Sequence, residues 1–85
     1  MHYVYLLRSD PYPTQTYIGQ TADLRQRLAT HNAGGSPHTA KYRPWRITTY
    51  LAFSEKSQAT AFERYLKSHS GIAFARKRLQ SVAEN

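Results

Sequence analysis

The chain opens with a short segment that is apolar on both faces of a strand. Residues 3–8 read YVYLLR, and such aromatic, β-branched and aliphatic residues favour β-structure. Because side chains alternate along a strand, one face carries Tyr3, Tyr5 and Leu7, and the other carries Val4 and Leu6. A strand with two apolar faces is typical of the interior of a sheet. We therefore expect this segment to be the central strand of its sheet.

The length and charge of the chain restrict its class. Its 85 residues, 40% of them hydrophobic and none of them Cys, suffice for one small core, so we expect a single domain over residues 1–85. No apolar stretch approaches the ~20 residues that cross a bilayer, and the N-terminus lacks a secretory signal, so we expect a cytoplasmic protein with no membrane contact. Twelve Lys and Arg against five Asp and Glu leave a net charge of +7, which indicates a polyanionic partner such as nucleic acid.

Two further strands are predicted from composition and turn signals. Residues 9–13 contain two prolines and mark a loop, after which Thr14–Gly19 is expected to return as the second strand of a hairpin. The polar, basic segment Ser36–Pro44 is expected to be a loop. It leads into Trp45–Phe53, whose threonines and Tyr50 have the β propensity of a third strand.

Helical patterns fill the intervals between these segments. Thr21 is the expected N-cap of a helix over Ala22–Ala33, which stops at a glycine pair. Ser54 is expected to cap a second helix that ends at Gly71, and Ile72–Val82 to form a short third one. The apolar spacing places these residues on the buried helix faces: Leu24, Leu28, Ala59, Phe62 and Leu66.

Five side chains on these elements could act on a phosphate: Tyr5, Tyr17, Arg27, His31 and Glu63. Arg27 and His31 are four positions apart and share a helix face, and Glu63 lies at the border of the apolar stripe of its helix. Each residue also has an ordinary structural explanation. A tyrosine suits a strand, an arginine can lie along an apolar stripe, a histidine suits a helix C-terminus, and Glu63 can pair with Lys67 four positions on. Taken singly, the residues leave both readings open.

Their order along the chain resembles that of a known enzyme family. The string Tyr17-Ile18-Gly19, with Tyr3-Val4-Tyr5 placed so that Tyr5 precedes Tyr17 by 12 residues, is similar to the paired motifs of the GIY-YIG nuclease superfamily. Arg27 and His31 follow as in the first helix of that family, and Glu63 as in its glutamate-bearing helix. The segment 66–71, LKSHSG, is similar to the small stand-alone, single-domain (UPF0213-like) members.

The resemblance implies a fold and a set of roles. The fold is α/β of the α+β kind, with a small three-stranded antiparallel sheet flanked by about three helices. Tyr5 or Tyr17 would assist deprotonation of the attacking water, Arg27 would stabilise the scissile phosphate, and His31 would support the tyrosine. A tyrosine, whose free pKa is near 10, needs a cation or an imidazole to lower that pKa before it can act as a base.

The resemblance also implies a metal, held by Glu63. Mg²⁺, or Mn²⁺, suits a site with one protein carboxylate, because it keeps several waters and binds substrate phosphate. Two departures from the family pattern stand out. Tyr3 replaces the first glycine of the paired motifs, and no Asn occurs between Asn32 and Asn85 to match the asparagine that many members carry after the glutamate.

Clustered cations predict a nucleic-acid surface. Candidate phosphate-binding residues are Lys41, Arg43, Arg46, Lys67, Arg76, Lys77 and Arg78. Tyr42 or Trp45 could stack on an unpaired base, although Trp45 equally suits a core. The chain has no zinc ligands, helix-turn-helix pattern or RNA-recognition signature, so we expect low sequence specificity.

The leading hypothesis is therefore a Mg²⁺-dependent endonuclease that selects DNA by structure or strand. It would act in DNA repair, recombination or uptake, on DNA rather than RNA, as a monomer or weak dimer, directed by substrate shape or by a partner protein. The alternative is a catalytically weak nucleic-acid-binding module on the same scaffold.

Overall fold

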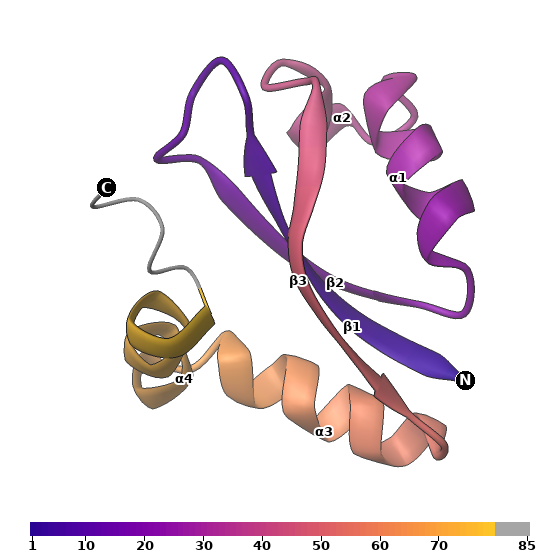
Figure 1. The fold of residues 1–85 in the computed structure, drawn as a ribbon, viewed down its shortest axis with the longest axis vertical. Coiled ribbons are helices and arrows are strands. Elements are labelled where there is room, and N and C mark those ends of the chain that lie inside the picture. The colour runs from indigo at the N-terminus through magenta and orange to yellow at the C-terminus, as the bar shows by residue number, and fades with distance from the viewer. Residues whose placement is uncertain (80–85) are drawn as a thin grey trace.

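A three-stranded antiparallel sheet forms the centre of the molecule (Figure 1). The structure is a computed structural model that describes residues 1–79. Strand β1 (His2–Ser9) lies between β2 (Thr16–Thr21) and β3 (Trp45–Phe53), in the order β2-β1-β3. The central position expected for the first strand is confirmed, and the third strand has the expected bounds. The second strand begins two residues later than expected, because residues 10–15 form the hairpin loop.

Within residues 1–79, four short helices flank this sheet, against the three or so expected for the α+β fold. They are α1 (Leu24–Asn32), α2 (Pro37–Ala40), α3 (Lys56–Leu66) and α4 (His69–Phe74), and α4 continues into a π-helical turn, η1 (Ala75–Leu79). No helix within residues 1–79 is long and apolar enough to cross a bilayer.

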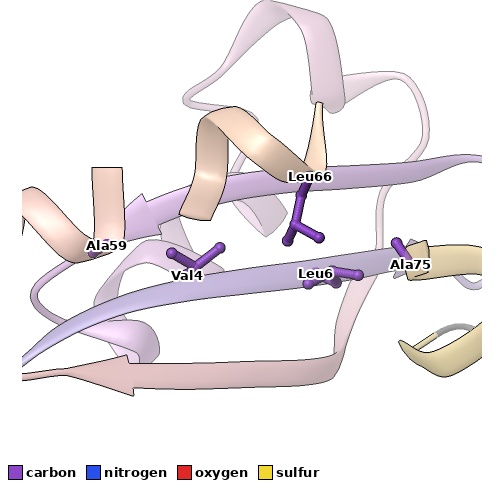
Figure 2. Packing of buried hydrophobic residues seen from close by; sticks show 5 residues of the cluster. All are labelled: Val4, Leu6, Ala59, Leu66 and Ala75. Carbon is purple, nitrogen blue, oxygen red and sulfur yellow. The ribbon is translucent and has the colours of Figure 1, made fainter. Parts of the chain in front are cut away.

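The two faces of β1 pack into two separate apolar clusters. Val4 and Leu6 point to the face covered by α3 and form the α3-side cluster with Ala59, Leu66 and Ala75 (Figure 2). The opposite face, toward α1, carries the α1-side cluster. Its buried members are Tyr5, Leu7 and Trp45, with Tyr17, Leu24, Leu28, Tyr42 and Ile47 packed around them. Helices α1 and α3 therefore lie on opposite sides of the sheet (Figure 1).

The N-terminus of α1 differs from the sequence prediction. Asp23, not Thr21, is its N-cap, and the Asp23 carboxylate accepts a hydrogen bond from the Gln26 N–H at 3.0 Å. Thr21 instead ends β2, and its hydroxyl accepts the Asp23 N–H at 3.1 Å. The segment expected as loop over Ser36–Pro44 also contains the single turn α2, which has Pro37 in its first turn.

The C-terminal helices are divided differently from the prediction. Glu55 rather than Ser54 occupies the N-cap position of α3, and α3 ends at Leu66 rather than at Gly71. Ser68 then caps α4, because its hydroxyl accepts the Gly71 N–H at 3.1 Å. A Cβ at Gly71 would collide with the carbonyl oxygen of Tyr65, so glycine is what allows α4 to turn this closely against the end of α3. The expected third helix thus begins at His69, and its residues 80–82 lie outside the described part of the chain.

Candidate active site

A buried hydrogen bond between Tyr5 and His31 lies at the centre of the candidate site. Tyr5 comes from the middle of β1 and points toward α1, and its hydroxyl lies 3.0 Å from His31 Nε2. Both residues are 2% exposed. Directly across the strand pair from Tyr5 is Gly19, and a Cβ there would collide with the Tyr5 hydroxyl. The glycine of the Tyr-Ile-Gly motif therefore makes the room in which the Tyr5 ring lies.

Tyr17 joins this pair from β2. It lies opposite Leu7 in the register, so its side chain is on the α1 side of the sheet with Tyr5. Its ring centroid is 4.9 Å from that of His31, edge to face, and 6.3 Å from that of Tyr5. Unlike Tyr5 it is only half-buried, so it is the more accessible of the two rings.

His31 is positioned by both of its ring nitrogens. It lies in the last turn of α1, where Nε2 meets Tyr5 and Nδ1 lies 2.9 Å from the hydroxyl of Thr39 in α2. Burial, and secondarily the charge of Arg27, lowers the pKa of His31 from its ordinary value of 6.5. The imidazole is therefore neutral at pH 7, and one nitrogen carries a lone pair.

Tyr5 is held as a neutral phenol. Burial, then the neighbouring Tyr17, raises the pKa of Tyr5 to about 12, and the opposing attraction of Arg27 does not cancel this rise. The expectation that the imidazole lowers the pKa of the tyrosine is therefore wrong for Tyr5, because removal from water outweighs every nearby charge.

Arg27 and Glu63 both act on the Tyr5 hydroxyl through their charges. Arg27, exposed on α1, lowers the pKa of Tyr5, and Glu63, from α3 on the other face of the sheet, raises it. Glu63 is half-buried, as the sequence predicts, and its carboxylate Oε2 lies 3.0 Å from Lys67 Nζ. The structure thus brings Tyr5, Tyr17 and His31 into contact, and the charges of Arg27 and Glu63 reach the Tyr5 hydroxyl.

The charge of Glu63 can act on the Tyr5 hydroxyl from the other face because β2 is an edge strand of the sheet. One turn before it, Thr60 hydrogen-bonds the Gln20 side chain of β2, and one turn after it, Lys67 lines the same surface pocket as Tyr17. The stretch of α3 that carries Glu63 therefore runs along the open edge, and its side chains can meet those from the α1 side around β2.

The donor set of the site fits only certain metals. Within residues 1–79, no cluster of three or more His, Asp or Glu side chains is arranged to hold an ion. A structural or catalytic zinc site needs three or four protein ligands, so the set does not fit zinc. It fits Mg²⁺ or Mn²⁺, which can be held by a single carboxylate such as that of Glu63 with waters and substrate oxygens completing the shell.

The candidate phosphate-binding residues are all exposed: Lys41, Arg43, Arg46, Lys67, Arg76, Lys77 and Arg78. Two of them are already paired with acids, since Arg46 Nε lies 3.2 Å from Asp10 and Lys67 binds Glu63. Trp45, proposed to stack on a base or to lie in the core, is 4% exposed and belongs to the core. Tyr42 is half-buried and stacks edge to face against both Tyr12 and Trp45.

Sequence reasoning missed two residues of this region. Thr39 lies in what was expected to be loop, and nothing in its local pattern pointed to a contact with His31 eight positions earlier. Gly19 was noticed only as part of a motif, and its fit beneath Tyr5 depends on the register of β1 and β2.

Comparison with known proteins places these features in a family. Residues 1–77 match the family model described as the GIY-YIG catalytic domain. The chain is 45% identical over 67 residues to the structure-specific endonuclease subunit SLX1 of Scheffersomyces stipitis, covering 71% of this chain but only 20% of that subunit. It is 37% identical over 70 residues to a UPF0213 protein of Staphylococcus haemolyticus, covering 81% of this chain and 83% of that protein.

A solved structure agrees with this grouping. The solution structure of a UPF0213 protein from Bacillus halodurans superposes with a TM-score of 0.52 at 29% identity, over 96% of this chain and 84% of that one. The expected fold, a three-stranded antiparallel sheet with flanking helices, is thereby confirmed. The chain therefore belongs to the GIY-YIG catalytic domain family, together with the UPF0213 proteins that it resembles.

Proposed function

We propose that this chain is a metal-dependent endonuclease that hydrolyses phosphodiester bonds in DNA. The observation that carries the proposal is the buried Tyr5–His31 hydrogen bond, whose hydroxyl also feels the charges of Arg27 and Glu63. A phenol paired with a neutral imidazole can move a proton, and a cation and a carboxylate beside it are the groups that phosphate chemistry needs. A binding surface alone requires none of these.

Proton removal from the attacking water would run through Tyr5 to His31. With a pKa of about 12, only about one Tyr5 in 10⁵ is ionised at pH 7, so a free phenolate is not the base. The water oxygen forms its bond to phosphorus while the water proton passes to the Tyr5 oxygen. The Tyr5 hydroxyl proton passes in the same step to His31 Nε2, and the bond from phosphorus to the leaving oxygen breaks. The leaving oxygen is then protonated by the imidazolium or by solvent.

Two charges stabilise this reaction. Negative charge grows on the phosphoryl oxygens as water attacks, and the Arg27 guanidinium, whose charge reaches the Tyr5 hydroxyl, would offset it. Glu63 would hold Mg²⁺ or Mn²⁺, which supplies Lewis-acid stabilisation of the same oxygens. The Lys67 ammonium occupies one oxygen of this carboxylate, so it must give way or share the carboxylate when the ion binds.

The substrate is proposed to be DNA selected by structure or strand, with little sequence specificity. The fungal relative described above is named a structure-specific endonuclease subunit, which supports a shape-dependent substrate and a partner protein for targeting. This chain spans only 20% of that relative, so the activity and assembly of the whole subunit are carried over only as part of this proposal. We further propose that residues 1–85 form one catalytic domain and that it serves DNA repair, recombination or uptake.

The test is cleavage of labelled branched, duplex and single-stranded DNA, with matching RNA, in Mg²⁺ or Mn²⁺ and in EDTA. Glu63→Gln keeps the size of the side chain but removes the charge that would hold the ion. We expect metal-dependent cutting by the native chain and none by this variant. The variant should bind DNA with the same affinity as the native chain. Arg27→Ala is expected to lower cleavage strongly and binding modestly.

Two results would overturn this assignment. Salt-sensitive DNA binding without cleavage of any substrate would favour the weak binding module instead. Equal loss of binding and cleavage in Glu63→Gln would mean that Glu63 supports the fold rather than an ion.

A further inference from the structure

The Tyr5–His31 pair is the first part of a longer chain of hydrogen bonds. The His31 ring links the Tyr5 hydroxyl at Nε2, 3.0 Å, to the Thr39 hydroxyl at Nδ1, 2.9 Å. The Thr39 hydroxyl in turn donates to the carbonyl oxygen of Ser36 at 3.3 Å. Tyr5, His31 and Thr39 are between 1% and 2% exposed, so water cannot readily substitute for any of these partners.

The number of hydrogens available decides which group donates in each of these hydrogen bonds. Each hydroxyl has one hydrogen to donate, and the neutral imidazole has one N–H. Within residues 1–79, His31 is the only hydrogen-bond partner of the buried Tyr5 hydroxyl. If Nε2 carried the imidazole hydrogen, the buried Tyr5 O–H would have no acceptor among residues 1–79, which is unfavourable. The arrangement that satisfies every group among the described residues has Tyr5 donating to Nε2 and the N–H on Nδ1.

Thr39 is the group that receives this N–H. Its hydroxyl hydrogen has an acceptor in the Ser36 carbonyl, so its oxygen is left to accept from Nδ1. The hydrogen bonds to Tyr5 and to Thr39 thus select the same tautomer of the His31 ring.

The position of Thr39 is itself determined by the sheet. The Trp45 indole N–H donates to the Thr39 carbonyl oxygen at 2.8 Å, and Trp45 lies buried at the start of β3. Asn32, at the end of α1, holds the backbone of Trp45 on both sides: its Oδ1 accepts the Trp45 N–H at 2.6 Å and its Nδ2 donates to the Trp45 carbonyl at 3.0 Å. Thr39 cannot move away from His31 without disturbing the junction of α1, α2 and β3.

We infer that Thr39 is a positioning residue for the proposed reaction. Its hydroxyl accepts the Nδ1 hydrogen of His31 and so keeps the Nε2 lone pair directed at the Tyr5 hydroxyl. Thr39 touches neither substrate nor metal in this scheme and acts only through the imidazole. The catalytic consequence rests on the proposed nuclease function, whereas the tautomer assignment does not.

The first test reads the tautomer directly. In the full chain labelled with ¹⁵N at histidine, the imidazole nitrogen shifts distinguish a protonated from an unprotonated nitrogen. We expect His31 to show hydrogen on Nδ1 and none on Nε2 at neutral pH. Hydrogen on Nε2 in the native protein would overturn the inference, whether or not the protein cleaves DNA.

The second test removes the Thr39 hydroxyl at constant shape. Thr39→Val should make His31 a mixture of tautomers and lower kcat by about 10- to 100-fold, with KM and DNA affinity unchanged. That range is the one seen for groups that orient metal-ligating histidines in the same way. Thr39→Ser, which keeps the hydroxyl, should restore the native tautomer and most of the rate. Thr49→Val is the matched control, because it removes a threonine hydroxyl bonded to the Leu79 carbonyl at 3.0 Å, away from His31.

Each outcome of the second test is informative. An unchanged tautomer in Thr39→Val, or a rate that Thr39→Ser does not restore, would contradict the positioning role. If the native protein cuts no substrate, the proposed function fails, while the nitrogen shifts of the native protein and of Thr39→Val still decide whether Thr39 selects the tautomer.

Discussion

Tyr5 illustrates how the buried site sets the chemistry of one side chain. Its hydroxyl is enclosed by β2, α1 and the His31 ring, and its pKa of about 12 keeps it protonated at every physiological pH. The same burial lowers the pKa of His31 and keeps that ring neutral. The protonated Tyr5 hydroxyl can therefore donate to the unprotonated Nε2 of His31, and not the reverse.

Gly19→Ala tests the space beneath Tyr5. The added Cβ would lie within 2.5 Å of the Tyr5 ring carbon Cζ, so the ring must shift and lengthen its bond to His31. We expect a loss of about 1–3 kcal/mol in the free energy of unfolding, typical of overpacking, and a fall in cleavage of more than tenfold. Denaturant unfolding and a cleavage assay measure the two effects. Thr16→Ala, an exposed change in the same strand, should alter neither, and a fully active Gly19→Ala would show that the ring has room to move.

The pH dependence of cleavage should reflect His31. Its folded pKa lies below the unfolded value of 6.5, so folding and activity both favour the neutral ring. Stability is therefore complete above pH 6.5 and falls between pH 6.5 and the lowered pKa, where the unfolded ring is protonated and the folded ring is not. Cleavage should fall as the pH decreases through the lowered pKa, because a protonated Nε2 cannot accept from Tyr5. On the alkaline side, stability should fall above pH 10, where the unfolded Tyr5 ionises and the folded one does not. Cleavage and unfolding measured from pH 4 to 9 check the acid limb, and a rate that rises on acidification would contradict it.

The edge position of β2 explains how two helices on opposite faces can serve one site. Arg27 and His31 come from α1 on one side of the sheet, and Glu63 comes from α3 on the other. Across a central strand these side chains would be separated by the full thickness of the sheet. Strand β2 lies at an open edge of the sheet (Figure 1), so side chains from both faces can approach each other around it.

The junction of α3 and α4 should be the most sensitive turn in the chain. Gly71→Ala places a Cβ against the Tyr65 carbonyl oxygen and the Leu66 backbone, which are main-chain atoms and cannot swing aside. We expect a loss of about 3 kcal/mol or more, at the upper end of overpacking effects, because Leu66 of the α3-side cluster must move as well. Thermal unfolding measures this loss. Ser70→Ala, an exposed change at the adjacent position of α4, is the control, and equal melting temperatures of the two variants would argue against the contact.

Six of the twelve Lys and Arg residues lie in two separate groups. One group of cations, Lys41, Arg43 and Arg46, surrounds the start of β3. The other group, Arg76, Lys77 and Arg78, follows α4, which lies away from the start of β3 (Figure 1). With a net charge of +7, the chain should bind DNA with an affinity that falls steeply with salt.

Neutralising the second group tests this distribution. Replacing Arg76, Lys77 and Arg78 together by Gln should reduce the slope of log affinity against log salt by about 2–3, because each lost phosphate contact removes about 0.9 from the slope for duplex DNA. The melting temperature should change little, since all three side chains are exposed. Fluorescence anisotropy over a salt series measures the slope. Arg25→Gln with Lys56→Gln is the control for lost charge outside both groups, and an equal change of slope per charge removed there would mean that only net charge matters.

The sequence by itself determined the sheet and the identity of the candidate residues. Alternation along residues 3–8 places β1 at the centre, and β propensity gives the bounds of β3, because these properties depend on neighbours in the chain. The apolar spacing of α3 likewise identifies Ala59, Phe62 and Leu66. The five candidate side chains were found by motif and resemblance. Helix ends were predicted less well, since Asp23 and Thr21 are both good caps locally and the end of β2 decides between them.

Only the tertiary structure decided how these residues work together. The pKa of Tyr5 rises rather than falls, because burial by residues distant in the chain outweighs the nearby charges. Gly19 lies beside the Tyr5 ring because of the register of β1 and β2. Thr39 contacts His31 because hydrogen bonds from Trp45, itself bound by Asn32, hold α2 against the sheet. Desolvation and hydrogen-bond direction depend on what surrounds a group in space, and a local sequence pattern carries no information about that.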